Sequence, residues 1–439
     1  RCCLTAAFTD RRLSVRPYLS LTIARFPSRQ IRQAGGHQFR DVQHVEGQPL
    51  RSRAAAQVHD AAGVVGHEDA RACRLNVAQL ALEDARRHLA EILLTLGVRA
   101  GDRVMVVGEN CASQVALIFA VWSVTAWVVN VNARLSPREV DAIRPHVGAR
   151  RVLYLGADSP DALQHSTRTR ATALSLGRWA TIGVSTLDEG CIAEPVTGER
   201  TRDVAALLYT TGTTGDPKGV MLTHASLLGE VESVFRWARV GPDDAVLGVL
   251  PLFHVLSQMA NLLLPLVKGA KVVYLETLNT TELLRALNQR QITIFAVVPQ
   301  FFYLIHERIF KEVAKRGKVA GWALRALMAV NRGLRTVGLN AGRVFFGKLH
   351  STFGDRMRYL ITGGSRFDPQ IGYDFHALGS DVLQAYGLTE TTGQAFAAMP
   401  HPNEIGPEGT RRPGAGARLS GPNASEEGEP ADRALRIKG

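Results

Sequence analysis

Residues 207–220 read Leu207-Leu208-Tyr209-Thr210-Thr211-Gly212-Thr213-Thr214-Gly215-Asp216-Pro217-Lys218-Gly219-Val220. The apolar start is typical of a buried strand, and it opens into a loop of Thr and Gly residues. Small residues let backbone N–H groups approach an anion closely, hydroxyl groups donate further hydrogen bonds, and a lysine adds positive charge. The pattern predicts a polyphosphate site formed by Thr210, Thr211, Gly212, Thr213, Thr214, Gly215 and Lys218. From these residues alone, a surface hairpin is the alternative.

The loop differs from the Walker A loop of P-loop nucleotide enzymes. Counted from Gly212, Pro217 stands where the second glycine of that motif belongs, and Gly219 replaces the Ser or Thr after the lysine. The chemistry therefore belongs to another class of nucleotide enzyme.

Three later segments accompany this loop. They read Pro251-Leu252-Phe253-His254, Thr362-Gly363-Gly364-Ser365 and Gln384-Ala385-Tyr386-Gly387-Leu388-Thr389-Glu390-Thr391-Thr392. Together with the loop they resemble four signatures, in order, of the acyl-adenylate-forming (AMP-binding) superfamily, which includes acyl-CoA synthetases, luciferases and peptide-synthetase adenylation domains. The resemblance is strongest to long-chain fatty-acid–CoA ligases. It implies that ATP and a fatty acid form an acyl-adenylate, and that the acyl group then passes to coenzyme A.

The resemblance also assigns roles to individual residues. The loop and Lys218 would cradle the β- and γ-phosphates of ATP, and Thr389 would hydrogen-bond the α-phosphate. Glu390 would hold Mg²⁺, for which a carboxylate is suited, and His254 would lie beside the substrate carboxylate. The nucleotide and the acyl carboxylate would be lined by Gly363, Gly364, Ser365, Gln384, Ala385, Tyr386 and Gly387, with Tyr386 stacked on the adenine.

Each of these residues also has a purely structural interpretation. An isolated Thr-Glu pair can cap a helix, a tyrosine can be a core aromatic, and glycines can serve a strand-to-helix turn. A lone histidine is usually structural, whatever its capacity to titrate near neutral pH. The four signatures in order favour the functional interpretation.

The composition is that of an ordinary globular protein. The chain has 439 residues, 46% hydrophobic and 21% charged, and can bury a large core. Its five cysteines are scattered without metal-ligand spacing, which favours a reducing, cytoplasmic location. The net charge is +12, but every basic residue before Lys218 is Arg or His, a pattern that favours coding bias over a nucleic-acid surface. We expect no nucleic-acid partner.

The periodicity predicts an α/β fold. Residues 82–96 carry apolar side chains at helical spacing, and 103–107 form a strand buried on both faces, as parallel sheets require. Residues 115–131, too short to span a membrane, predict a buried helix running into a strand. Further strands are predicted at 270–275, 291–298, 357–362 and 381–386, with helices opening near Asn279, Pro299 and Asp368. This alternation predicts doubly wound, mostly parallel sheets, with the signatures at the carboxyl ends of strands.

We expect three parts along the chain. Residues 1–75, with twelve Arg and no Lys, are an atypical extension for which disorder is one interpretation. Residues 76–400 form the AMP-binding α/β domain, and 401–439 begin a small β subdomain. The superfamily's Thr-Gly-Asp signature, hinge and C-terminal domain with its catalytic lysine have no match here. We therefore expect an N-terminal domain truncated at its C-terminus, with impaired turnover.

Residues 308–348 contain ten Lys or Arg and one acidic residue, interleaved with apolar side chains. One interpretation is peripheral contact with an anionic membrane that supplies the fatty acid, and a second is a solvated basic face over a helical core. A third is attraction of the phosphates of coenzyme A by the basic residues. The hydrophobic stretches 253–267 and 295–305 favour an apolar tunnel for a fatty acid, with core packing as the alternative.

The signatures leave the acid and the acceptor open. An acyl-AMP ligase that loads a carrier protein, or an aryl-CoA ligase, would share the first half-reaction. A non-catalytic nucleotide-binding relic would keep the fold without turnover.

Overall fold

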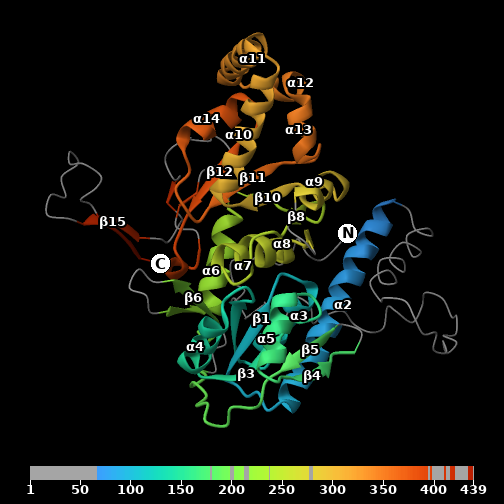
Figure 1. Ribbon diagram of the computed structural model, residues 1–439, viewed down its shortest axis with the longest axis vertical. Helices are drawn as coiled ribbons and strands as arrows, with labels where there is room; N and C mark the ends of the chain where they lie inside the picture. The colour runs from blue at the N-terminus through green and yellow to red at the C-terminus, as the bar shows by residue number, and fades with distance from the viewer. Residues whose placement is uncertain are drawn as a thin grey trace, which may run out of the picture.

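The computed structural model describes residues 67–177, 180–197, 202–211, 217–236, 238–275, 280–393, 396–397, 410–411, 416–420 and 434–438. Within these residues, two seven-stranded sheets follow one another along the long axis of the molecule (Figure 1). A separate antiparallel pair joins β15 (Gly416–Ser420) to β16 (Ala434–Lys438). The α/β fold with mostly parallel sheets confirms the sequence prediction.

The first sheet has the strand order β4-β5-β3-β1-β2-β6-β7. Strands β3, β1, β2 and β6 run parallel, whereas β4, β5 and β7 add antiparallel pairs at the two edges. The bounds are β1 (Arg103–Gly108), β2 (Trp127–Asn132), β3 (Ala149–Tyr154), β4 (Thr172–Ser175), β5 (Thr181–Val184), β6 (Val204–Thr211) and β7 (Pro217–Thr223).

Strand β1 is buried on both faces, as its apolar run Val104-Met105-Val106-Val107 predicted. Val104 and Val106 belong to one core, whereas Met105 and Val107 belong to another on the opposite face. Side chains alternate between the faces of a sheet, so a strand between two helical layers must be apolar at every position. The layers come from α2 (His67–Thr95) and α3 (Ala112–Ser123) on one face and α4 (Pro137–Val147) and α5 (Pro160–Arg168) on the other. Helix α2 begins inside the segment 1–75; residues 1–66 lie outside the described residues.

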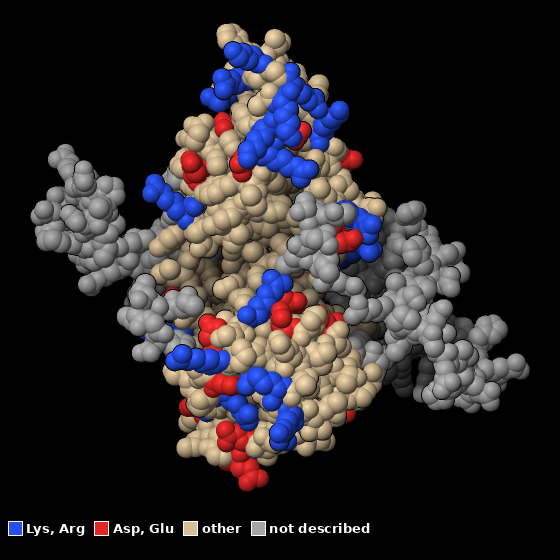
Figure 2. Space-filling model, viewed as in Figure 1, with Lys and Arg blue, Asp and Glu red and all other residues tan. Residues whose placement is uncertain are grey.

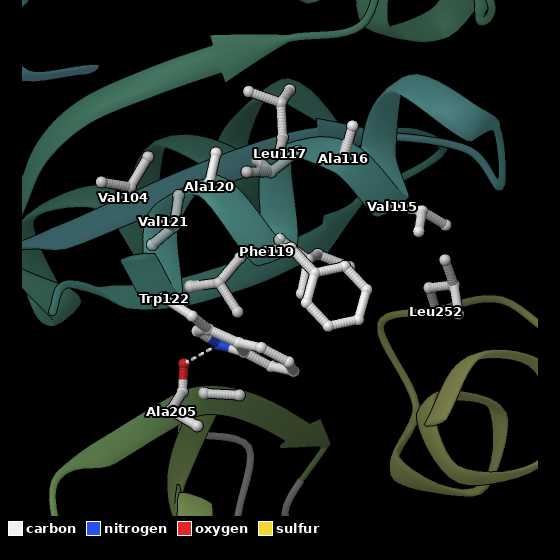
Figure 3. Packing of buried hydrophobic residues seen from close by; sticks show 14 of the residues in the cluster. Val104, Val115, Ala116, Leu117, Phe119, Ala120, Val121, Trp122, Ala205 and Leu252 are labelled. Atoms are coloured by element: carbon white, nitrogen blue, oxygen red, sulfur yellow. Dashed lines mark hydrogen bonds between the residues drawn. The ribbon is translucent and has the colours of Figure 1, made fainter. Parts of the chain in front are cut away.

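Helix α3 is buried along most of its length and leads into β2, as residues 115–131 predicted. The indole Nε1 of Trp122 donates a hydrogen bond of 2.7 Å to the carbonyl of Ala205 on β6 (Figure 3). Leu252, from the second half of the chain, joins the same core as Val115 (Figure 3). Neither α3 nor any other helix in the described part of the chain is long and apolar enough to cross a membrane.

The second sheet has the strand order β14-β13-β12-β11-β10-β8-β9. Its parallel strands are β9, β8, β10, β11 and β12, and its antiparallel edge is formed by β13 and β14. The bounds are β8 (Ala245–Leu247), β9 (Lys271–Val273), β10 (Ile294–Val297), β11 (Tyr359–Gly363), β12 (Val382–Tyr386), β13 (Phe396–Ala397) and β14 (Thr410–Arg411).

Three groups of helices accompany this sheet (Figure 1). Between the two sheets lie α6 (His224–Val234), α7 (Val255–Gln258), the π-helix η3 (Met259–Leu263) and α8 (Leu264–Val267). The helices that pack on the second sheet are α9 (Thr280–Gln289) and α14 (Pro369–Ala377), together with the first turns of α10 (Pro299–Lys315). The chain between β10 and β11 forms a helical protrusion. It consists of the rest of α10 together with α11 (Lys318–Thr336), α12 (Gly342–Phe345) and α13 (Gly347–Phe353).

Local signals in the sequence located several of these helices. Pro299 occupies the first turn of α10, and the Asp368 side chain caps α14 by accepting a hydrogen bond from the Gln370 N–H. Phe302 is fully buried against Phe295, Phe367 and Phe375 in the core beside the second sheet. For Phe302, the core-packing interpretation of the stretch 295–305 therefore holds.

The protrusion is fastened to the second sheet by polar contacts. Arg335 of α11 donates two hydrogen bonds, of 2.8 and 2.7 Å, to the carboxylate of Asp381, the residue before β12. Burial alone would raise the pKa of Asp381, but hydrogen bonds from His376 and Arg335 outweigh it and lower the pKa to about 2. Nearby, the buried Asn331 donates to the carbonyl of Ala377 at 2.9 Å and accepts from the Ala341 N–H at 2.8 Å.

We predict that Asp381→Asn lowers the free energy of unfolding near neutral pH by about 2 kcal/mol, because the variant loses a charge-assisted pair. The pKa of Asp381 lies below its ordinary value of 3.8, so its contribution is present above that pH and is lost as the pH falls towards about 2. Urea unfolding from neutral pH down to pH about 3 measures this effect. The exposed Asp355→Asn is the control, and equal pH profiles for wild type and Asp381→Asn would contradict the assignment.

Candidate active site

The predicted phosphate loop connects an antiparallel hairpin. Thr210 of β6 pairs with Lys218 of β7, and Thr211 pairs with Pro217, so both ends of the loop are fixed by strand pairing. Strand β6 continues beyond the apolar residues to Thr211, and Pro217 and Lys218 already belong to β7. The loop residues themselves, 212–216, lie outside the described residues. The Lys218 side chain is exposed to solvent.

Two further signatures lie side by side at the carboxyl edge of the second sheet. Gly363 at the end of β11 pairs with Ala385 of β12, and a Cβ atom at Gly363 would lie 2.7 Å from the Ala385 carbonyl oxygen. Gly364 has φ +84°, and a Cβ atom there would meet nothing within 4 Å. The chain thus turns sharply beside open space, where backbone can approach a ligand. Ser365 is exposed beside it.

The Thr-Glu signature forms the short 3₁₀ turn η4 (Thr389–Thr391), just after β12. Thr391 is buried, and its hydroxyl accepts from the Leu388 N–H at 3.0 Å, which fixes the turn. Glu390 projects into solvent from the same turn. Strand β7 contacts η4, so the hairpin that carries Lys218 lies against the turn that carries Glu390. The structure thereby brings together two signatures that lie far apart in the sequence.

The fourth signature places His254 at the start of α7. Its side chain makes no capping hydrogen bond, and its ring lies 4.5 Å from that of Phe253. The ring is open to solvent on one side, and its partial burial on the other lowers the pKa of His254. The neutral imidazole is therefore favoured near neutral pH. Leu256, two residues further on, would contact a Cβ atom at Gly363 at 3.5 Å, so α7 adjoins the end of β11.

Sequence reasoning missed Asn110, which follows β1. Its amide nitrogen donates to the carbonyls of Gly248 and Leu250 at 3.2 and 2.7 Å, and its amide oxygen accepts from the Leu252 N–H at 2.8 Å. One side chain from the first sheet therefore holds the segment that leads from β8 to His254.

A buried polar cluster holds the same segment from its other side. The Leu250 carbonyl also accepts from the hydroxyl of Ser257 and from the amide of Asn261 at 3.2 Å, and Gln258 donates to the Leu252 carbonyl at 2.9 Å. All three side chains are almost completely buried. In the sequence, Ser257, Gln258 and Asn261 are three polar residues within an otherwise apolar stretch. An ordinary helix would explain this pattern equally well, so the pattern did not reveal the cluster.

We predict that Asn110→Ala destabilises the protein by about 2 kcal/mol, because two backbone carbonyls and one N–H group lose a partner. Urea unfolding measures this effect. Asn288→Ala, which removes one exposed hydrogen bond, is the matched control. Equal losses of stability in Asn110→Ala and Asn288→Ala would contradict a role of Asn110 in holding the segment before His254.

The residues around η4 fit a magnesium ion shared with a nucleotide. The described residues contain no cluster of three His, Cys, Asp or Glu side chains that would enclose an ion by themselves. An exposed carboxylate such as Glu390 suits Mg²⁺, which commonly uses one or two carboxylates together with substrate phosphates.

The chain is similar to known proteins over most of its length. The family described as AMP-binding enzyme matches residues 52–431. The long-chain-fatty-acid–CoA ligase FadD15 of Mycobacterium bovis is 27% identical over 353 residues, covering 75% of this chain and 58% of the ligase. A feruloyl-CoA synthase of Amycolatopsis is 27% identical over 358 residues, covering 81% of this chain and 62% of that enzyme. The chain thus spans less than two thirds of the length of these relatives.

Two solved structures share the fold. The inhibitor-bound N-terminal domain of FACL13 from Mycobacterium tuberculosis has a TM-score of 0.58 and 21% identity, covering 79% of this chain and 78% of that domain. ATP-bound MatB from Rhodopseudomonas palustris has a TM-score of 0.57 and 21% identity, covering 82% of this chain and 64% of MatB.

Proposed function

Because the chain belongs to the family of AMP-binding enzymes, we propose that it takes part in converting a carboxylic acid and ATP to an acyl-adenylate, from which the acyl group passes to coenzyme A. One observation carries the proposal above the others. The hairpin with Lys218 lies against the turn with Glu390, beside the paired ends of β11 and β12.

The reaction brings together two anions, the carboxylate and ATP, so positioning and charge neutralisation are the main tasks of the protein. Lys218 would neutralise the β- and γ-phosphates together with Thr210 to Gly215, and Thr389 would hydrogen-bond the α-phosphate. Glu390 would hold Mg²⁺, which supplies positive charge to the phosphates. Open space at Gly364 would leave room for the nucleotide and the carboxylate, beside the closely packed Gly363, with Tyr386 against the adenine.

His254 would lie beside the substrate carboxylate as a neutral hydrogen-bond donor, in keeping with its lowered pKa. Attack by the carboxylate on the α-phosphate expels pyrophosphate and needs no protein nucleophile. Burial raises the pKa of the Cys111 thiol, next to Asn110 in the chain, to about 12, which disfavours the thiolate.

For the acid, we favour a fatty acid, and the similarity to a long-chain-fatty-acid–CoA ligase supports this choice. Similarity to a feruloyl-CoA synthase supports an aryl acid as the second candidate. Acyl transfer to a carrier protein, or a nucleotide-binding relic without turnover, would use the same nucleotide site. We further propose a cytoplasmic location with peripheral membrane contact through residues 308–348.

We predict that Lys218→Ala weakens MgATP binding about thirtyfold, because a charge-assisted contact of about 2 kcal/mol is lost. Glu390→Gln should leave affinity for metal-free ATP unchanged while removing most of the gain that Mg²⁺ provides. Calorimetric titration of ATP with and without Mg²⁺ measures both effects, with the exposed Glu189→Gln as the control. Wild-type Mg²⁺ dependence in Glu390→Gln would remove the metal assignment.

We predict that a non-hydrolysable fatty-acyl-adenylate mimic binds at least tenfold more tightly than an aryl mimic of the same linkage, because a long fatty chain would bury more apolar surface than an aryl group. Direct titration of the folded chain tests this. Preference for the aryl mimic would select the second candidate, whereas binding of neither mimic by folded protein would contradict the proposed adenylate site itself.

A further inference from the structure

Helix α11 carries an apolar stripe that faces solvent. Val319 is 83% exposed, Trp322 77% and Val330 52%, although each is a residue that folding normally hides. The spacing of i, i+3, i+4, i+7 and i+11 puts the members on one face of the helix. All of the stripe is exposed: Val319, Trp322, Ala323, Ala326 and Val330, continued by Val337 at the end of the helix.

A row of cations borders the stripe. Lys318, Arg325 and Arg332 follow one another at intervals of seven residues and so share one flank of the helix. All three are exposed, and within the described residues the structure gives them no ion pair. Helix α11 contains no Asp or Glu. These charges are therefore available to an anionic partner.

The neighbouring helix α10 differs in this respect. Arg308, Lys311 and Lys315 line a groove of about 540 Å³ together with Glu307 and Glu312. Glu307 pairs with Lys311, and Glu312 pairs with Lys315 at 2.7 Å. The charge on this groove is largely compensated, so α11 carries the uncompensated positive surface.

The rest of the molecule holds the stripe outward. On the opposite face of α11, Met328 and Asn331 are buried, and Asn331 and Arg335 are hydrogen-bonded to the body of the protein. The helix cannot rotate its apolar stripe inward without breaking these bonds. It lies at one end of the long axis, beyond α10 and α14 (Figure 1), and Lys and Arg side chains gather on that end of the surface (Figure 2).

We propose that α11 lies flat on an anionic lipid membrane, with Val319, Trp322 and Val330 among the acyl chains and the row Lys318, Arg325 and Arg332 at the headgroups. An exposed apolar stripe flanked by lysine and arginine is the arrangement that binds at a bilayer surface. A second copy of the chain fits less well, because two such helices would bring their uncompensated cations together. The inference names the element behind the membrane contact proposed above, and its test does not depend on ligase activity.

The test is co-sedimentation of the full chain with vesicles of phosphatidylcholine, with and without phosphatidylglycerol, at increasing salt. We expect binding to the anionic vesicles only, weakening as salt rises. Each basic residue near such a surface contributes to the free energy of membrane binding through its charge. Reversing all three (Lys318→Glu, Arg325→Glu and Arg332→Glu) should therefore reduce binding at least a hundredfold. The matched control reverses three exposed arginines elsewhere (Arg99→Glu, Arg138→Glu and Arg290→Glu) and should retain binding within about threefold.

Removal of the apolar part is tested separately. Trp322→Ser should reduce binding about tenfold, whereas Ile192→Ser, which alters an equally exposed apolar residue elsewhere, should not. Circular dichroism establishes that every variant is folded. Equal binding to neutral vesicles, or equal losses in the α11 and control variants, would overturn the proposal. So would a wild-type dimer that Trp322→Ser converts to monomers, with no vesicle binding by either.

Discussion

The two halves of the molecule depend on a shared backbone carbonyl. Leu250 accepts hydrogen bonds from Asn110, which follows β1 of the first sheet, and from Ser257 and Asn261, which lie between the sheets. A buried carbonyl without partners is costly, so the segment has few alternative positions. Leu252 adds an apolar contact in the core around α3. The position of His254 relative to both sheets follows from these few contacts.

The candidate site combines the ends of two parallel strands with an antiparallel hairpin. The parallel strands β11 and β12 end together, which places Gly363 next to Ala385 and leaves the following turns free to meet a ligand. The hairpin of β6 and β7 approaches from the other sheet and touches η4. A site built between two sheets draws its residues from segments far apart in the chain, and each sheet fixes its own share.

The sequence was informative where local patterns suffice. The apolar run 104–107 indicated a strand covered on both faces, and Asp368-Pro369 identified the start of α14. Asn110 could not be recognised, because its partners lie about 140 residues later and nothing nearby indicates them. The sequence did not indicate that Pro217 and Lys218 open strand β7, because proline cannot donate a ladder hydrogen bond and is rare inside strands. Their pairing with Thr211 and Thr210 places them in that strand.

Periodicity also left the burial of aromatic side chains undecided. Phe302 and Trp322 both lie in helices rich in apolar residues, but Phe302 is fully buried and Trp322 is 77% exposed. Which face of a helix is covered depends on what packs against it, and that is a property of the tertiary structure. The four signatures indicated which residues form the candidate site. How these residues are positioned relative to one another depends on the two sheets.

The protrusion also bears on how such a chain can diversify. Strands β10 and β11 are paired neighbours in the second sheet, yet helices α10 to α13 all lie between them in the sequence. The entropic cost of closing a loop grows only with the logarithm of its length, so doubling an insertion costs about 0.6 kcal/mol. The part of the insertion beyond the residues of α10 and α13 that pack on the sheet can therefore lengthen or shorten through evolution at little expense to the sheet. An outward-facing module can be exchanged there while the strands that carry the candidate site stay as they are.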